Sequence, residues 1–273
     1  MGLAAVLLGN YKKRNVQRRA PLVGYVREEK KKMNFYNKDN PKSLQQMFGS
    51  IAQQYDKTNA ILSFQMHKLW NKKLIRAAIE KQLPSTYLDL CCGTGEIAFK
   101  YLKRRSLPCK AYLLDFCPEM LYCAKERAKH LNLQPHTLTY LQADAQKIPL
   151  AEESIESVTL AYGIRNIPHP QQCFNEIYRV LNTGGTVGIL ELTQPTQPLI
   201  RAGHKLYLKT ILPIMGQLVT SNRKAYEYLC NSIRSFISPQ ELESMLKIAG
   251  FKQASVITLM GGIATILVAK KGN

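Results

Sequence analysis

From residue 87 onward, short apolar runs alternate with amphipathic stretches along the chain. The apolar runs predict strands near residues 87–91, 111–115, 137–142, 157–162 and 186–192, followed by a final pair near 253–260 and 263–269. Residues 118–131 carry Met, Leu and Ala at helical spacing behind Pro118, which suits a first helical turn. Strands that alternate with helices are typical of a mostly parallel sheet with helices on both faces. The pattern therefore predicts an α/β fold built on seven strands.

The last predicted helix carries signals at both of its ends. Ser238 is expected to cap its start, with Pro239 in the first helical position and Glu241 three residues after the cap. Gly250 predicts the end of this helix, just before the final pair of strands.

Two segments do not follow the alternation. We expect residues 41–273 to form one domain, in which residues 41–86 form an N-terminal helical cap and residues 196–236 a helical insertion before the last helix-strand unit. The insertion is more apolar than a free surface loop, since it contains Leu206, Leu208, Ile211, Leu212, Ile214, Met215, Leu218 and Val219. Four roles stay open for it: a substrate lid, a homodimer contact, a bilayer-facing patch and an ordinary core helix.

The chain is strongly basic. It has 38 Lys and Arg against 19 Asp and Glu, a net charge of +19. Such an excess favours an anionic partner, which means nucleic acid, an acidic membrane surface or a phosphate-bearing ligand.

Part of this charge lies in the N-terminal segment. Residues 1–32 hold nine basic and two acidic residues. We expect residues 1–40 to be a basic extension without fixed structure. A solvated tail, a true start at Met33, a functional arm and organelle targeting all stay open, whereas the apolar run before the basic residues has the wrong order for a secretory signal.

Other sequence features narrow the location and the class of site. No run reaches the roughly 20 apolar residues of a spanning helix, so we expect a cytoplasmic protein, soluble or peripheral at the inner face of a membrane. Seven cysteines without a C-x-x-C pair predict free thiols in a reducing compartment. The five histidines show no metal spacing, and we expect no metal site.

The chemistry starts where the first predicted strand runs into a glycine-rich turn. Gly93 and Gly95 allow a tight turn and a close approach of the backbone to a ligand. The spacing Gly93-x-Gly95-x-x-Ala98 also fits a dinucleotide fingerprint, for which Asp115 is placed as the ribose-binding acid. The turn alone therefore leaves two cofactor classes open.

Charge separates these two classes. Asp89 and Glu96 flank the turn, where a dinucleotide would place a pyrophosphate and S-adenosylmethionine its ammonium and sulfonium. Unit charges about 4 Å apart near a protein surface interact by roughly 4 kcal/mol, so these acids favour the cationic ligand. We therefore predict S-adenosylmethionine as the cofactor.

Two further acids follow the next strands. Asp115 ends the second strand, at the sheet edge where open parallel sheets bind ligands, and can accept both ribose hydroxyls. Asp144 follows the third strand and is placed to accept from the adenine amine, although an exposed loop acid is the alternative interpretation.

Several separate segments, in order, resemble the quinone C-methyltransferases of menaquinone, phylloquinone and ubiquinone biosynthesis, from about residue 47 to residue 270. The resembling segments are residues 47–52 with Tyr55, Asp56 and Asn59, then 63–70, 162–166, 178–181 and 226–233. The resemblance implies a Rossmann-like class I methyltransferase fold and an S-adenosylmethionine-dependent enzyme.

Within this family the resemblance assigns cofactor contacts to Thr94, Asp115, Asp144 and Ala145. Many members have glycine where this chain has Cys92 and aspartate where it has Glu96; some plastid and related bacterial members look like the double-cysteine version. This difference favours a naphthoquinone substrate. Ala161, also expected at the cofactor, lacks the hydroxyl that some members use there.

The implied reaction is C-methylation of a demethylated prenyl naphthoquinol, such as demethylmenaquinol or demethylphylloquinol. The ring must be reduced, because an oxidised quinone is electrophilic and does not attack a sulfonium methyl group. Loss of a proton from the adjacent hydroxyl makes the ring carbon more nucleophilic, so the enzyme needs a proton acceptor there.

Residues for this chemistry come from the resembling segments. We expect Arg165 to stabilise the developing phenolate and Asn166 to position the hydroxyl or a bridging water, while Asp56 or His67 takes the proton. The expected substrate contacts are Tyr55, Phe64, Tyr162 and Tyr226. Ordinary packing roles stay open for His67, Tyr55 and Phe64.

Two other functions are compatible with the charge and the fold: an RNA methyltransferase and a non-catalytic module that binds cofactor or nucleic acid. Residues 161–166 lack the Asp/Asn-Pro-Pro-Tyr motif of amino-methylating enzymes, and no cysteine nucleophile motif for base methylation is present. We therefore expect no nucleic-acid partner, and the basic surface can equally serve anionic lipid headgroups.

Overall fold

The computed structural model describes residues 38–80, 82–212, 214 and 223–272, all within one compact unit that spans residues 34–273. Residues 1–37 of the predicted basic extension lie outside the described residues, as do Met215, Leu218 and Val219 of the insertion.

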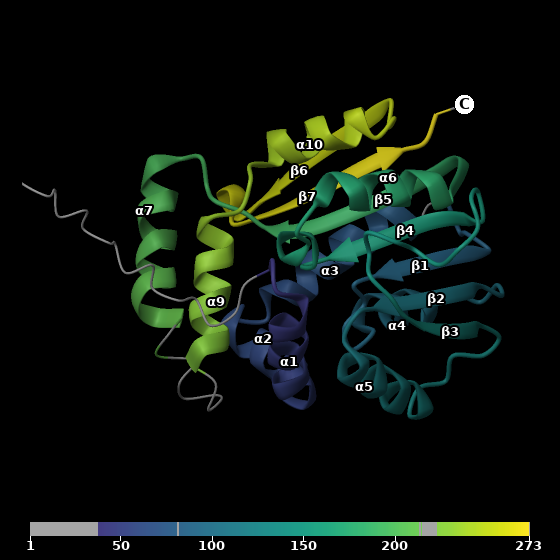
Figure 1. Cartoon of the computed structure of the whole chain (residues 1–273), viewed down its shortest axis with the longest axis horizontal. Coiled ribbons are helices and arrows are strands. Elements are labelled where there is room, and N and C mark those ends of the chain that lie inside the picture. The colour runs from purple at the N-terminus through teal and green to yellow at the C-terminus, as the bar shows by residue number, and fades with distance from the viewer. Residues whose placement is uncertain (1–37, 81, 213, 215–222, 273) are drawn as a thin grey trace, which may run out of the picture. The chain divides into compact units, whose positions relative to one another are not determined.

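A seven-stranded sheet organises the described chain (Figure 1). Its strands, in spatial order, are β3 (Thr137–Gln142), β2 (Lys110–Asp115), β1 (Thr86–Leu90), β4 (Ile155–Ala161), β5 (Leu181–Leu192), β7 (Ala264–Lys270) and β6 (Gln253–Leu259). Neighbours from β3 to β5 are parallel, and β7 runs antiparallel to both β5 and β6. The predicted α/β fold with a mostly parallel sheet is confirmed.

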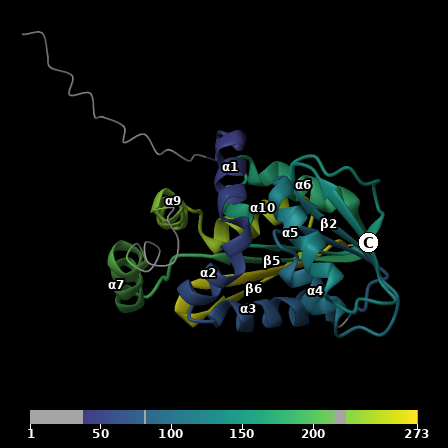
Figure 2. The ribbon, with the colours of Figure 1, turned by 90° about the horizontal axis from the view of Figure 1, so that it is seen from below.

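Helices cover both faces of the sheet, as the pattern predicted. One face packs against α3 (Met66–Ile75), the π-helix η2 (Arg76–Glu80), α4 (Glu96–Leu102) and α5 (Pro118–Lys129), and the other against α6 (Pro170–Val180) and α10 (Pro239–Ile248). Figure 2 shows α3 and α4 on the opposite side of the sheet from α6 and α10. Each face thereby buries its own apolar core, with Leu74 and Ile75 on one and Phe174 and Leu246 on the other.

The boundary signals of the last helix are confirmed. The Ser238 side chain accepts a hydrogen bond from the Glu241 N–H, and the Glu241 carboxylate accepts from the Ser238 N–H at 2.7 Å. This capping box satisfies donors that the first turn of α10 cannot pair internally. The helix ends two residues before Gly250.

Further helices gather beyond the carboxyl ends of the parallel strands (Figure 1). They are α1 (Pro41–Ile51), η1 (Ala52–Gln54), α2 (Tyr55–Leu62), α7 (Pro198–Leu206), the π-helix η4 (Tyr207–Ile211) and α9 (Arg223–Arg234). Leu62 of α2 packs with Leu208, Leu212 and Ile233, so the N-terminal helices and the insertion share a core. The two segments outside the alternation thus meet over the edge where ligands of such sheets bind.

The described residues contain no helix that is both long and apolar enough to span a bilayer. All seven cysteines are free thiols, and the described residues form no group of ligands that could hold a metal ion.

Candidate active site

Two cavities of about 370 Å³ each open at the carboxyl edge of the sheet. The first, here the acidic cavity, lies at the ends of β2 and β3 and is lined by Asp115 and Asp144. The second, here the apolar cavity, lies between α2, α3 and the insertion. Five residues line both cavities: Tyr55, Cys91, Gly93, Ala161 and Tyr162. One elongated molecule can therefore extend from one cavity into the other.

The glycine-rich turn between β1 and α4 forms part of this junction. Gly93 has φ +55° and Gly95 has φ +78°, a left-handed backbone that favours glycine. A Cβ atom at Gly95 would lie 2.4 Å from the Phe99 ring. The turn thus keeps its shape only because two positions have no side chain, as the sequence predicted.

Asp115 ties the turn to β2. Its carboxylate accepts hydrogen bonds from the Gly93 N–H at 2.8 Å and the Cys117 N–H at 2.9 Å. Burial raises the pKa of Asp115 to about 6, against the opposing effect of these donors. Asp144 is exposed and accepts from the Gln146 N–H, and Ala145 beside it is buried. All three predicted residues line the acidic cavity.

Asp89 lines the apolar cavity from beneath the turn, and Glu96 lines it from the first turn of α4. The Asp89 carboxylate is 1% exposed and accepts from the Ala98 N–H at 3.1 Å and the Thr159 hydroxyl at 2.8 Å. Burial raises the pKa of Asp89 to about 7. A cation in this cavity would stabilise the ionised form, whereas a pyrophosphate would oppose it.

The residues that line the two cavities therefore fit S-adenosylmethionine. The acidic cavity offers carboxylates for ribose hydroxyls and an adenine amine, the turn offers close backbone approach, and the junction leads to two acids that suit a positively charged end. Ala161 lies at this junction, and its methyl side chain offers no hydroxyl group to a ligand there.

Arg165 reaches the apolar cavity from the short 3-10 helix η3 (Ile164–Asn166) behind β4. Its buried guanidinium pairs with the fully buried carboxylate of Glu191 and donates to the Tyr162 carbonyl at 2.9 Å. Its Nε is buried without a hydrogen-bond partner among the described residues. Glu191 was missed, although a lone acid within the apolar β5 sequence indicates a buried ionic partner.

Two of the predicted residues do not line the apolar cavity. Asn166 lines the acidic cavity and not the apolar one, and its Oδ1 accepts from the Tyr228 hydroxyl at 2.9 Å. The side chain therefore lies at the acidic cavity and contacts α9. Tyr226 lines neither cavity, since it packs in the shared core with Cys230 and Ile233; Leu229 of the same helix lines the apolar cavity instead.

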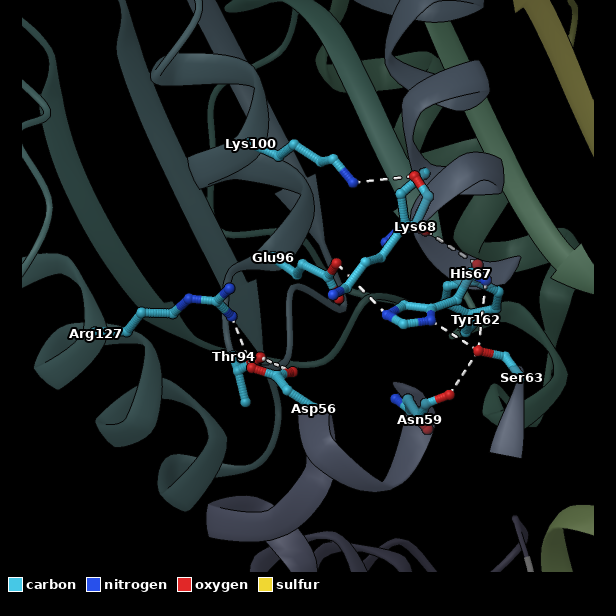
Figure 3. Close-up of polar contacts among 11 residues, drawn as sticks. Asp56, Asn59, Ser63, His67, Lys68, Thr94, Glu96, Lys100, Arg127 and Tyr162 are labelled. Atoms are coloured by element: carbon cyan, nitrogen blue, oxygen red, sulfur yellow. Dashed lines mark hydrogen bonds and ion pairs between the residues drawn. The ribbon is translucent and has the colours of Figure 1, made fainter. Parts of the chain in front are cut away.

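Asp56 lines the apolar cavity, but both of its oxygens are engaged (Figure 3). Oδ1 accepts from the Thr94 hydroxyl at 2.7 Å, and Oδ2 pairs with Arg127 Nη1 at 2.7 Å. The side chain therefore links α2 to the glycine-rich turn and to α5. This arrangement favours a structural role for Asp56 over proton transfer.

His67 is buried in the wall of the apolar cavity, with 5% of the residue exposed. Its Nδ1 lies 2.7 Å from Ser63 Oγ and its Nε2 lies 3.7 Å from Glu96 Oε1. Burial lowers the pKa of His67, while the Glu96 carboxylate opposes this effect. Burial therefore favours the neutral imidazole over the imidazolium.

Aromatic side chains complete the apolar cavity. Tyr55, Phe64 and Tyr162 line it as predicted. Trp70 of α3 and Tyr207 of the insertion, which are not among the predicted contacts, line it as well. Further insertion residues in the wall are Gly203, His204 and Leu212. Helical spacing indicated an apolar face on the insertion, but it did not indicate which part of the molecule this face contacts.

Comparison with known proteins agrees with this geometry. The model of the ubiE/COQ5 methyltransferase family matches residues 36–271. A demethylmenaquinone methyltransferase from Protochlamydia amoebophila (strain UWE25) is 51% identical over 239 residues, which cover 88% of this chain and 99% of that protein. The ubiquinone/menaquinone biosynthesis C-methyltransferase UbiE from Bartonella quintana (strain Toulouse) is 36% identical, covering 82% of this chain and 86% of that protein.

A solved structure supports the fold. A SAM-dependent methyltransferase from Aquifex aeolicus superposes with a TM-score of 0.55 at 17% identity, covering 82% of this chain and 98% of that chain. This confirms the predicted Rossmann-like methyltransferase fold. Neither the family nor these relatives support an RNA substrate. The chain belongs to the ubiE/COQ5 methyltransferase family.

Proposed function

We propose that this enzyme transfers a methyl group from S-adenosylmethionine to a ring carbon of a reduced, demethylated prenyl naphthoquinol. Family membership and the names of the similar relatives support a quinol substrate. The observation that carries the proposal is the junction of the two cavities at Gly93, where the cavity lined by Asp115 and Asp144 meets the cavity walled by aromatic side chains.

The residues of the acidic cavity and of the turn would hold the cofactor. Asp115 and Asp144 supply acceptors for the nucleoside, and Asp89 supplies a negative charge toward the amino-acid end. When bound, S-adenosylmethionine supplies the methyl group as an electrophile on a positively charged sulfur. Asp89 needs no reorganisation for this task, because two hydrogen bonds already hold its carboxylate.

The apolar cavity would take the quinol ring. Trp70, Tyr55 and Tyr162 offer aromatic surface that orients a flat ring and excludes water. Arg165 contributes a fixed positive charge, since Glu191 holds its guanidinium in place. That charge stabilises a phenolate more strongly here than it would in water, because the site is buried.

The insertion would place the cavity against a membrane that holds the prenyl tail. Leu199 is 86% exposed and Leu206 is 59% exposed, and the exposed Lys205 and Lys209 lie on the same segment. Apolar side chains beside lysines suit the surface of an anionic bilayer. We therefore propose peripheral binding at the inner face of an anionic membrane.

Vesicle sedimentation tests this membrane contact. Wild type should sediment with phosphatidylglycerol vesicles more than with phosphatidylcholine vesicles, and Leu199→Ser with Leu206→Ser should reduce the bound fraction. Equal binding by the double variant would refute the proposal. A concentration-dependent dimer that the same substitutions dissociate would assign the surface to a second copy of the chain instead.

The proposed reaction is tested with one substrate in two redox states. Purified protein receives methyl-labelled S-adenosylmethionine with either reduced demethylmenaquinol or oxidised demethylmenaquinone. Label should enter the reduced substrate alone, because only the electron-rich ring attacks a methyl cation equivalent. Equal labelling of both forms, or of neither, would contradict the proposal.

A further inference from the structure

The hydrogen bonds around His67 determine which of its ring nitrogens carries the hydrogen (Figure 3). Ser63 Oγ lies 2.6 Å from the carbonyl oxygen of Asn59, which can only accept, so the single hydroxyl hydrogen of Ser63 is used there. Ser63 Oγ must then accept the hydrogen bond from His67 Nδ1 at 2.7 Å. Nδ1 therefore holds the hydrogen, and Nε2 keeps a free lone pair.

Nε2 has a carboxylate beside it but no hydrogen bond to it. Its distance of 3.7 Å to Glu96 Oε1 is too long for a hydrogen bond, and a negative charge this close stabilises a protonated ring. Lys68 and Lys100 act in the opposite direction, and Asp56 adds a weaker favourable charge. Burial thus favours the neutral ring before the reaction, and the Glu96 carboxylate would stabilise the imidazolium once it forms.

The other titratable groups in the apolar cavity are less suited to accept a proton. Both oxygens of Asp56 and both of Asp89 already accept hydrogen bonds. Arg165 is a cation, and burial keeps the pKa of the Tyr162 hydroxyl well above its ordinary value. His204 lines the cavity too, but no hydrogen bond among the described residues fixes its tautomer.

We propose that His67 Nε2 accepts the proton of the substrate's ring hydroxyl, that Ser63 and the Asn59 carbonyl fix the reactive tautomer, and that Glu96 stabilises the resulting imidazolium. This inference rests on the proposed quinol methylation. His67 touches the reacting atoms and is a catalytic residue, whereas Ser63 and Glu96 are positioning residues.

Every proton in the proposed reaction has a donor and an acceptor. The O–H bond of the ring hydroxyl breaks, its electron pair stays on oxygen, and an N–H bond forms at Nε2, so a neutral pair becomes phenolate and imidazolium. The ring carbon then bonds to the methyl group while the sulfur–methyl bond breaks, which leaves neutral S-adenosylhomocysteine. The methylated ring carbon loses its own hydrogen as a proton to water. His67 then returns its proton to the ring oxygen and is neutral for the next turnover.

The tautomer is measured first, without substrate. In the ¹⁵N spectrum of histidine-labelled wild type at pH 7.5, His67 should show a protonated Nδ1 and an unprotonated Nε2. Ser63→Ala should give a mixture of tautomers, and Ser63→Thr, which keeps the hydroxyl, should restore the single form. A wild-type spectrum with a hydrogen on Nε2 would overturn the inference, whatever the variants do.

Kinetics then tests the role. His67→Gln should lower kcat by about a hundredfold or more and remove the acid limb of the kcat profile, with little change in the KM for quinol. Glu96→Gln should shift that limb to lower pH, because the His67 pKa falls when the carboxylate charge is lost. The matched control is His130→Gln, an exposed site that should keep wild-type rates.

The outcomes separate this inference from the proposed function. Wild type that methylates no quinol refutes the function, while the ¹⁵N spectrum still tests the tautomer. Methylation that persists in His67→Gln with its acid limb intact refutes the role of His67 alone. An acid limb that disappears in His204→Gln and not in His67→Gln would assign the proton to the other imidazole.

Discussion

The buried ion pair between Arg165 and Glu191 leads to a sharp prediction about stability. Glu191 is fully buried and also accepts the Leu192 N–H at 2.7 Å and the Arg165 N–H at 3.2 Å. Glu191→Gln removes the carboxylate that pairs with the guanidinium among the described residues and turns one acceptor into a donor. Leaving a buried charge unpaired costs about 3–5 kcal/mol. For a domain of this size, that loss lowers Tm by roughly 6–20 °C.

Urea unfolding followed by tryptophan fluorescence measures this loss, since Trp70 is the single tryptophan and is 6% exposed. The double variant Glu191→Gln with Arg165→Met removes the cation as well, and should recover much of the lost stability while staying inactive. If Glu191→Gln lowers the free energy of unfolding by less than about 1 kcal/mol, the Arg165 guanidinium is solvated. That result would refute the proposal that Glu191 holds the Arg165 charge in place.

Three more outcomes follow from the same geometry. Gly95→Ala should abolish detectable binding of S-adenosylhomocysteine in calorimetry, because the added Cβ would clash with the Phe99 ring and Gly95 has a φ of +78°. Near-normal affinity would refute the role of the glycine-rich turn in cofactor binding. Burial raises the pKa of Asp89 to about 7, above its value in the unfolded chain. The free energy of unfolding of the wild type therefore falls as pH rises from about 4 to 7, because the buried carboxylate loses its proton in that range. Asp89→Asn should therefore gain stability relative to wild type across that window, by up to about 4 kcal/mol in urea titrations. A difference in the free energy of unfolding that does not change with pH would contradict the raised pKa of Asp89. Arg165→Ala should lower turnover while calorimetry finds cofactor affinity nearly intact, and a large loss of affinity would contradict its role.

Local signals predicted the sheet and the cofactor half of the site. Apolar runs of strand length indicated all seven strands, because this signal lies within each segment and does not require knowledge of its distant neighbours. Strand β5 begins five residues earlier than expected, at Leu181, because Leu181 already pairs with Ile155 of β4. The glycine pair that the pattern treats as a break lies inside the strand, where Gly184 has φ +80° and the register with β4 shifts. Asp115 and Asp144 were found because parallel strands bring their carboxyl ends to one edge.

The remaining contacts depend on how distant helices pack. Asp56 meets Arg127 across 71 residues, and Arg165 meets Glu191 across 26. Residue types and spacing mark each side chain as polar, but they do not give its partner, so the sequence does not distinguish a base from a structural carboxylate at Asp56. Tyr226 shows the same limit, because an aromatic residue at helical spacing suits a shared core as well as a cavity wall.

The central claim is that the joined cavities direct a methyl group from S-adenosylmethionine to a quinol. The most direct measurement adds labelled S-adenosylmethionine and the purified protein to a whole-cell extract kept under reducing conditions, then separates lipids, RNA and protein. The account predicts that label accumulates in one prenylated naphthoquinol. Label in RNA or protein, with none in the lipid fraction, would contradict it.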